Sequence, residues 1–323
     1  MGSILLSFVI PCYRSEHTIE KVIKEIIDVV GQREGYDYEI IAVNDASPDR
    51  VYTILHRLAS DNHKIKIINL AKNMGKHAAV LAGYSVVRGR FIVNLDDDHQ
   101  CPVYELWKLA DPVMHDECDI ATAQYYSKKE LLWKRMGSRV NMIVSEIMLK
   151  KPKGLRFENF SVIKRFVCDQ AVLYKNPYPF LEGLFLQVTD RVMTVAMENR
   201  NRADDNTTGF TFWKSFSLFV NGMTSFSVKP LRMATMIGSL FSVGGFLYGS
   251  YIVIRRLIDS EVTVGYSSVM AVLLFSSGLI MLMLGLIGEY VGRIFICINN
   301  APQYVIRNTV NIQDDGTYRE DTM

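Results

Sequence analysis

The first 120 residues alternate between short apolar segments and longer amphipathic ones, and this alternation constrains the fold more than any other feature of the chain. The short segments have five or six residues and the composition of buried strands. The segments between them repeat their apolar residues at helical spacing. Strands separated by helices predict an α/β fold with a doubly wound, mostly parallel sheet. We expect strands at residues 5–10, 39–43, 65–70 and 91–95, and helices at 15–30, 49–62 and 77–87.

Three consecutive carboxylates, Asp96, Asp97 and Asp98, follow the fourth predicted strand, and His99 and Gln100 come next. Open α/β sheets bind ligands in the crevice beyond the carboxyl ends of their strands. Residues two apart on extended backbone point to the same side, so Asp96 and Asp98 are candidate ligands of one cation, with Gln100 as a third. These oxygens suit Mg²⁺ or Mn²⁺, with a substrate phosphate completing the shell. The alternative is a solvated acidic turn.

Each of the three earlier predicted strands also ends in a polar turn. Tyr13 could stack on a base, Asp45 could accept an N–H from one, and Lys76 adjoins a small-residue turn that could approach a diphosphate. Taken singly, these turns are equally typical of helix caps. Because all four turns fall at one edge of the predicted sheet, together they indicate a nucleotide site. Its candidate residues are Pro11, Tyr13, Glu16, Asp45, Asn73, Gly75, Lys76 and Asp96.

Composition narrows the class of protein. The 323 residues are 49% hydrophobic and carry a net charge of +2, which gives no basic field for nucleic acid. The five cysteines are odd in number and form no CxxC pair, so we expect a reducing compartment without a disulfide or zinc framework. The apolar run at residues 4–10 has no basic residue before it and is closed by Pro11, so it is expected to be a strand rather than a signal peptide.

Two long stretches, residues 233–254 and 269–287, contain no charged residue. As a helix the first would measure about 33 Å, which is enough to cross a bilayer. They predict a transmembrane hairpin with spans at about 233–254 and 269–290, since buried core helices are seldom this long and uncharged. The aromatic and basic segment before them is typical of an interfacial helix. Basic residues flank the hairpin at both ends and also occupy its loop, so the positive-inside rule favours cytoplasmic termini by a small margin.

Six motifs follow one another along the chain: VIPCYRSE, VNDASPD, NMGKHAAVLAG, NLDDDHQCP, SFSVKPLR and GEYVGRI. In order and spacing they resemble the family-2 glycosyltransferases that charge polyprenyl phosphates. This group includes bactoprenol glucosyltransferases, undecaprenyl-phosphate aminoarabinose transferases and dolichyl-phosphate mannose synthases. The resemblance extends to about residue 307. The first four motifs are general to family-2 transferases with a GT-A fold, whereas the last two and the hairpin are specific to the membrane-anchored branch.

The resemblance implies roles for particular residues. It places the nucleobase near Pro11, Tyr13, Glu16 and Asp45, and the metal and diphosphate at Asp96 and Asp98 with Gln100. It places the acceptor phosphate at Arg135, Ser138, Arg165 and Arg202, and the catalytic residues at Asp96, Asp98 and Arg165. The chain departs from the family at residues 159–163, where the usual Asp-Phe-Arg-Leu-Met has lost its arginine, and at 202–210, where a lysine is absent. These segments face the acceptor and the sugar in the family, so the donor sugar stays open.

The resemblance also implies a domain order: a cytoplasmic GT-A domain at 1–211, an amphipathic interfacial segment at 212–232, a transmembrane hairpin at 233–292 and a cytoplasmic tail at 293–323. Within the first domain the residues predict a helix at 131–148, a strand at 160–163 and a loop at 199–211.

The expected activity is inverting transfer of a sugar, from a UDP-linked donor as first choice, to undecaprenyl phosphate on the cytoplasmic leaflet of the bacterial inner membrane. The bilayer is then a partner, nucleic acid is not, and a homo-oligomer is compatible with the sequence. The alternatives are a GDP-mannose-using polyprenyl-phosphate mannose synthase, a polymerising sugar synthase and an inactive nucleotide- or lipid-binding scaffold. A lipid phosphate is already ionised near neutral pH, so we expect no general base, and we interpret His99 as a neighbour of the metal ligands.

Overall fold

The structure, a computed structural model, describes residues 4–125, 155, 157–175, 179–198, 229–258, 265–299 and 302–312. The chain divides into two compact units. The first comprises Met1–Glu146, Lys150–Gly209 and Asn300–Met323, and the second comprises Ile147–Leu149 and Phe210–Asn299. The helix predicted at 131–148, the loop at 199–211 and most of the interfacial segment at 212–232 lie outside the described residues.

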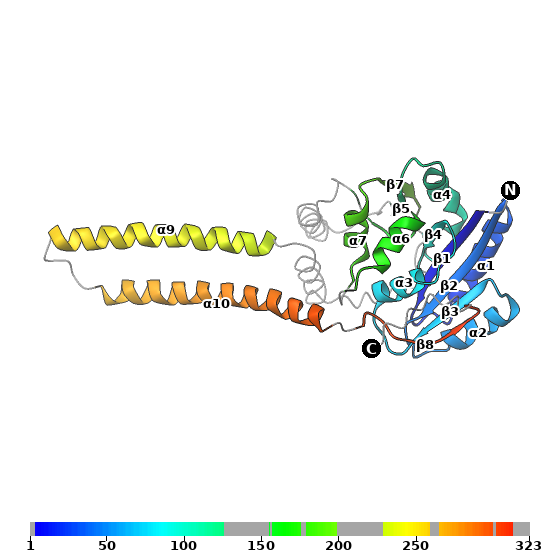
Figure 1. The fold of residues 1–323 in the computed structure, drawn as a ribbon, viewed down its shortest axis with the longest axis horizontal. Coiled ribbons are helices and arrows are strands. Elements are labelled where there is room, and N and C mark those ends of the chain that lie inside the picture. Colours follow the sequence, from blue (N-terminus) through cyan, green and yellow to red (C-terminus); the bar gives the residue numbers. More distant parts are fainter. Residues whose placement is uncertain are drawn as a thin grey trace. The chain divides into compact units, whose positions relative to one another are not determined.

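The first unit is built on a mixed sheet, in which the described part of the chain contributes eight strands in the order β7-β5-β6-β4-β1-β2-β3-β8 (Figure 1). β1 pairs in parallel with β2 and β4, β2 with β3, and β5 with β7, while β6 and β8 run antiparallel to their neighbours. The strands are β1 Ile4–Cys12, β2 Tyr36–Asn44, β3 Ile65–Leu70, β4 Phe91–Asn94, β5 Ile120–Tyr125, β6 Ser161–Lys164, β7 Val192–Met197 and β8 Ile306–Val310. The mostly parallel α/β sheet that the alternation predicts is confirmed.

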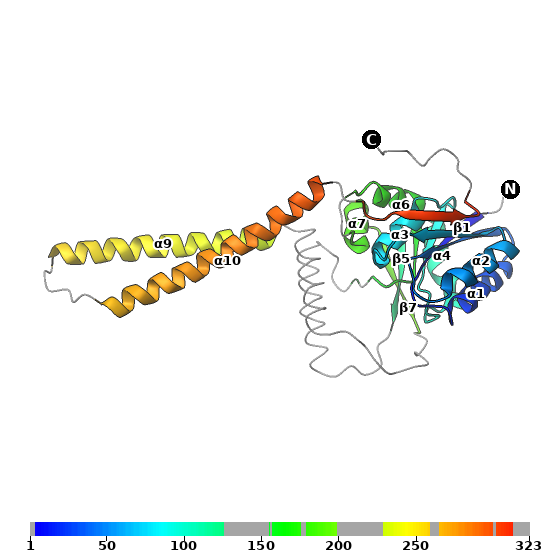
Figure 2. The same cartoon turned by 90° about the horizontal axis from the view of Figure 1, so that it is seen from below.

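Helices cover both faces of this sheet, as a doubly wound fold requires (Figure 2). α1 is amphipathic because Ile19, Val22, Ile23 and Ile26 recur at helical spacing and are all buried. On the other face α3 packs closely on β1, and a Cβ at Gly83 would lie 2.4 Å from Val9 Cγ1. One face carries α1 Ile19–Gly31, α2 Val51–Asp61 and α4 Leu106–Met114, which follows the short helix η1 Val103–Glu105. The other face carries α3 Lys76–Tyr84 and α6 Arg165–Val172, and α7 Leu181–Val188 packs against α6.

The segment after the second long helix differs from the expectation of a tail. Residues 306–310 form the edge strand β8, which pairs antiparallel with β3. Asn69 and Asn308 lie opposite each other in this pairing, and Asn69 Nδ2 donates to Asn308 Oδ1 at 2.8 Å. Asn308 Nδ2 in turn donates to the Tyr52 hydroxyl at 2.6 Å. The first unit is therefore assembled from both ends of the chain, and the other predicted domain boundaries stay predictions.

The described residues of the second unit form two long helices, α9 Lys229–Ile258 with 30 residues and α10 Tyr266–Ile298 with 33. At 1.5 Å per residue they measure about 45 and 50 Å. The rings of Phe241 and Phe275 lie 5.5 Å apart between them. Within the described residues, one stretch, Phe275–Gly292 in α10, is long and apolar enough to cross a membrane. The second crossing, predicted at 233–254, stays a prediction.

Candidate active site

Four turns meet at the carboxyl edge of the parallel strands β1 to β4, and each contains a residue with positive φ. The φ values are 57° at Arg14, 48° at Ala46, 85° at Gly75 and 62° at His99. This left-handed region suits glycine and is costly for other residues. Residues held in such conformations cluster at ligand-binding and catalytic sites. Four of the seven described residues with positive φ thus lie at this edge, whereas Gly35, Asp116 and Asn311 lie elsewhere.

The turn after β1 is joined to the turn after β2 by three hydrogen bonds, in each of which a backbone N–H donates to a side-chain oxygen. Arg14 N donates to Ser47 Oγ at 2.8 Å, Glu16 N donates to Asp49 Oδ2 at 2.9 Å, and Arg50 N donates to Glu16 Oε2 at 3.0 Å. The side chain of Glu16 thus fixes the shape of this edge, and its predicted place near a nucleobase stays a prediction.

Tyr13 sits on the turn that these bonds hold. Its side chain is 42% exposed, and the Arg14 guanidinium lies 5.5 Å from its ring centroid. An exposed ring on a fixed backbone is the arrangement that the predicted stacking on a base requires. Pro11 is closer to the centre of the edge, where it lines the pocket described below.

Asp45 is buried and joins the second turn to the third. Its two carboxylate oxygens accept the backbone N–H groups of Met74 at 2.7 Å and Gly75 at 2.9 Å. Burial raises the pKa of this carboxyl, and the two N–H donors oppose the shift. The structure assigns Asp45 to holding the turn from which Asn73 and Lys76 project, and its predicted contact with a base stays a prediction.

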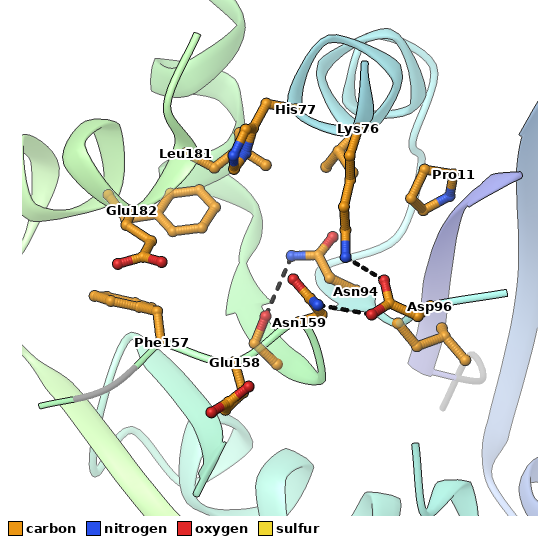
Figure 3. A pocket seen from close by; sticks show the side chains of 14 residues that line it. Pro11, Lys76, His77, Asn94, Asp96, Phe157, Glu158, Asn159, Leu181 and Glu182 are labelled. Atoms are coloured by element: carbon orange, nitrogen blue, oxygen red, sulfur yellow. Dashed lines mark hydrogen bonds and ion pairs between the residues drawn. The ribbon is translucent and has the colours of Figure 1, made fainter. Parts of the chain in front are cut away.

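In the acidic turn, Asp96 and Asp97 have different partners. Asp96 forms an ion pair with Lys76 and accepts a hydrogen bond from Asn159 Nδ2 at 2.6 Å (Figure 3). Asp97 Oδ2 instead accepts the backbone N–H of Tyr13 at 2.9 Å, and burial raises the pKa of Asp97. The two carboxylates therefore have different partners, and the predicted placement of Asp96 and Asp98 on one side of the turn stays a prediction.

Asp98 and Gln100 follow Asp97 in the sequence and belong to the same acidic turn. Asp98 Oδ1 accepts the backbone N–H of Gln100 at 3.1 Å. In the part of the chain that the structure describes, no three side chains of His, Cys, Asp or Glu gather as a metal site. A cation held by Asp96 and Asp98 would therefore take further ligands from a substrate, as the sequence predicts.

A pocket opens beside Asp96, with about 500 Å³ of empty space including its mouth. Lys76, Asn94 and Asn159 surround Asp96 at one end of it (Figure 3). The other end is walled by Phe157 and Phe185, whose ring centroids are 6.2 Å apart. Glu158, Leu181 and Glu182 complete the lining there, together with His77 at the start of α3. Aromatic walls with a few polar groups are typical of pockets for small organic ligands.

Asn94, the last residue of β4, forms part of the pocket wall, although the sequence did not mark it as a candidate. Its Nδ2 donates to the Tyr84 hydroxyl at 2.6 Å and to Ser161 Oγ at 3.3 Å. Its Oδ1 is buried and has no hydrogen-bond partner among the described residues. The only signal in the sequence is an amide at the end of an apolar strand. Asn159 begins the segment 159–163 that the resemblance places at the acceptor and the sugar, but nothing in the sequence predicts that its side chain reaches Asp96.

Two histidines lie near the site. His99 directs Nε2 to Glu25 Oε2 of α1 at 2.9 Å, so its ring is held against that helix. His77 lines the pocket, and burial, with a smaller effect of Lys76, lowers its pKa to about 4. His77 is thus neutral near pH 7, and Lys76 supplies the positive charge next to Asp96.

Arg165 does not lie at this site. β6 runs antiparallel to β4, with Ser161 opposite Asn94 and Lys164 opposite Phe91, so the chain reaches Arg165 at the far end of β4. Four residues of strand, about 13 Å, separate the two ends. Arg165 Nε donates to Asp169 Oδ1 at 2.8 Å and its backbone N–H donates to Arg90 O at 3.0 Å. The predicted catalytic and acceptor-phosphate roles of Arg165 are therefore not supported, because β6 carries it away from Asp96.

The other predicted acceptor-phosphate residues, Arg135, Ser138 and Arg202, lie outside the described residues. Of the donor and metal candidates, Pro11, Lys76 and Asp96 line the pocket, and the contact of Asp98 and Gln100 with a cation stays a prediction. Arg165 is the one predicted acceptor residue within the described part of the chain.

Comparison with known proteins shows which families and relatives the chain resembles. Residues 7–175 match the model of glycosyl transferase family 2, and residues 229–294 match the family described as the GtrB C-terminal hairpin. An uncharacterized glycosyltransferase, YkcC of Bacillus subtilis, is 30% identical, with 98% of each chain covered. The SfII prophage-derived bactoprenol glucosyl transferase of Shigella flexneri is 28% identical over 94% of this chain and 98% of its own. The undecaprenyl-phosphate 4-deoxy-4-formamido-L-arabinose transferase of Proteus mirabilis is 27% identical, over 98% and 97%.

Proposed function

Because the chain belongs to glycosyl transferase family 2, we propose that it transfers a sugar, with inversion, from a nucleotide sugar to undecaprenyl phosphate. The donor is UDP-linked in this proposal, and GDP-mannose is the alternative. The names of two relatives and the match to the hairpin family support a polyprenyl phosphate as acceptor. The reaction takes place at the cytoplasmic face of the bacterial inner membrane and makes a lipid-linked monosaccharide for cell-surface glycan or lipid modification.

One observation carries the proposal: Asp96, paired with Lys76, faces a pocket at the edge where the turns after four parallel strands converge. That edge is where α/β sheets bind nucleotides. The exposed ring of Tyr13 and the turn held by Asp45 supply a surface for a base and a diphosphate. The pocket beyond Asp96 is then the space for the sugar.

The residues at Asp96 fit a divalent cation. Carboxylate oxygens are hard ligands, and the Lys76 ammonium already occupies the position of a cation on Asp96. Mg²⁺ or Mn²⁺, bound by Asp96 and Asp98 with Gln100, would neutralise the charge that builds on the departing diphosphate. Lys76 is also the first residue of α3, where N–H groups at a helix N-terminus attract anions. Its side chain and this helix end would both bind the diphosphate.

The acceptor chemistry needs no general base from the protein. The second dissociation of a phosphate monoester falls at about pH 6, so its oxygens are ionised when the reaction occurs. The site has to bind the phosphate and align it with the sugar carbon. His99 is engaged by Glu25, and the low pKa of His77, about 4, makes it a poor proton acceptor.

His99→Asn is expected to keep most of the turnover, within about threefold of the unchanged protein. Asparagine tolerates the positive φ at this position, whereas leucine would add backbone strain that is unrelated to proton transfer. Rates should be measured between pH 7 and 8.5 with saturating metal, where the acceptor is ionised and the rate should be flat. A loss of about 10³, with normal binding of donor and lipid, would show that His99 acts as a base.

The proposed function is tested by incubating membranes that contain the protein with undecaprenyl phosphate and a panel of nucleotide sugars. The donor that yields product then identifies the sugar, and the mass of the lipid product gives the number of sugar residues added. A single added sugar from one UDP-linked donor is the expected product. Product from GDP-mannose alone would favour the mannose synthase, a ladder of masses would favour the polymerising synthase, and no metal-dependent turnover with any donor would favour the inactive scaffold.

A further inference from the structure

Five large hydrophobic side chains are exposed among the described residues of the first unit, and three of them belong to α6, to its C-cap Leu173 or to the segment before β8. Phe166 and Leu173 are 45% and 66% exposed, and Val305 is 44% exposed. Phe166 and Leu173 are seven residues apart, two helical turns, so they project from the same side of α6. The remaining two, Tyr13 and Tyr104, are at the nucleotide edge and on η1.

Residues 302–307, which we call the strap, are fixed to the end of α6 and to the end of β3. Gln303 Nε2 donates to Tyr174 O at 2.6 Å. The backbone N–H of Ala71 donates to Val305 O at 2.8 Å, and Arg307 donates to Ala71 O at 3.1 Å. Because Tyr174 directly follows Leu173, these bonds bring the strap to the C-terminal end of α6. We call the exposed side chains of Phe166, Leu173 and Val305 together the α6–strap face.

The strap is also the first part of the first unit that the chain reaches after α10. α10 ends at Ile298, so five residues lead to Gln303 and cannot extend beyond about 17 Å. The apolar stretch of α10 ends at Gly292, and six further helical residues add about 9 Å. If this stretch crosses the membrane, the α6–strap face lies within about 26 Å of the point where the chain leaves the hydrocarbon.

The charges around this face favour an anionic surface. Three exposed cations lie close to this face in sequence. Lys72 follows Ala71, Lys175 follows Tyr174, and Arg307 comes two residues after Val305. The nearest acidic side chain on α6, Asp169, is paired with Arg165 at 2.8 Å and adds no net charge. Proteins bind an anionic bilayer through such surfaces, because the apolar side chains enter the headgroup region and the cations are attracted to the anionic lipids.

We propose that the α6–strap face docks the catalytic unit on the anionic surface of the bilayer. The proposal rests on the membrane-bound acceptor in the proposed function. A phosphate at the end of a lipid stays at the headgroup level, so a catalytic unit held only by its chain connections would meet it in many orientations. Docking through α6 and the strap fixes one orientation and so raises the frequency of productive encounters.

The test uses the full chain with a cysteine at position 173, labelled with an environment-sensitive fluorophore. Cys297 is half-buried and is replaced by serine, and the other four cysteines are buried. Tyr104→Cys is the matched control, because Tyr104 is 51% exposed and lies away from the α6–strap face. In vesicles of phosphatidylethanolamine and phosphatidylglycerol, quenching by spin-labelled lipids is expected at position 173 and not at 104. Equal quenching at both positions, or none at 173, would overturn the proposal.

Transfer assays separate docking from the activity itself. Leu173→Asp is expected to lower transfer to undecaprenyl phosphate in these vesicles by about tenfold, and to leave transfer to a short-chain prenyl phosphate in detergent unchanged. Unchanged transfer in both assays would overturn the proposal. If the unsubstituted protein transferred no sugar while position 173 was still quenched, the proposed function would fail and docking would stand. A loss in both assays would mean that the variant is misfolded, and the quenching at position 173 would then decide.

Discussion

Asp96→Ala is expected to lower sugar transfer at least about a thousandfold, which corresponds to about 4 kcal/mol of transition-state stabilisation. The substitution removes the carboxylate that meets Lys76 and Asn159 at the mouth of the pocket. It therefore removes both the predicted metal ligand and the group that orients Lys76. The measurement is turnover with saturating Mg²⁺ or Mn²⁺, together with calorimetric binding of the nucleoside diphosphate with and without metal. Asp98→Ala is expected to behave in the same way.

Asp97→Asn is the matched control for Asp96→Ala. Asp97 has a different partner from Asp96, and an asparagine oxygen can still accept the backbone N–H of Tyr13. Turnover should therefore stay within about tenfold of the unchanged protein, because the shape of the turn is kept. Alanine is a poorer control, since it would release Tyr13 as well. If Asp97→Asn were as damaging as Asp96→Ala, the assignment of the metal ligands would be wrong.

The parts of the fold and site that depend on local pattern could be predicted from the sequence. The alternation of apolar strands and amphipathic helices gave β1 to β4 in parallel, and with them the edge where the polar turns meet. Asp96 and Asp97 have different partners, as alternation at a strand end predicts, but β4 ends at Asn94 and Asp97 and Asp98 lie in a turn, where the two-residue period of extended backbone does not apply. These inferences need no knowledge of which distant segments pair.

The parts that depend on non-local pairing could not be predicted. Arg165 matches a motif position, but periodicity does not say that β6 runs antiparallel to β4, and this direction places Arg165 at the opposite end of the strand. Asp45 was expected to face a base, whereas its oxygens hold the turn at Met74 and Gly75, which is formed 30 residues later. The pairing of Asn69 with Asn308 joins residues 239 apart, and β8 has no strong strand pattern of its own.

The pairing of β8 with β3 leads to the second large prediction, which concerns membrane topology. Strands in one sheet fold in the same compartment, so the chain before α9 and the chain after α10 lie on the same side of any membrane. The number of crossings between them must then be even. One crossing by α10 alone is excluded on this argument, although Phe275–Gly292 is the one described stretch that meets the criteria of length and apolarity.

We therefore expect α9 to cross the membrane together with α10, which agrees with the hairpin family matched at residues 229–294. Alkaline phosphatase, which is active only outside the cytoplasm, is expected to be active when fused after residue 262, between the two helices. The same enzyme fused at residue 323 is expected to be inactive, and a green fluorescent protein should give the reverse pattern. Expression of each fusion is checked by immunoblot, so that an inactive phosphatase is not mistaken for a missing one.

The outcomes of this experiment separate the alternatives. Phosphatase activity at residue 323 would require an odd number of crossings, and it would contradict the pairing of β3 with β8. Inactive phosphatase at both positions would mean that neither helix crosses, and that the enzyme is held at the membrane surface. The basic residues at both ends and in the loop make the positive-inside rule a weak guide here. The return of the chain to the sheet is the stronger constraint, because the eight-stranded sheet cannot close its β3 edge with β8 from across a bilayer.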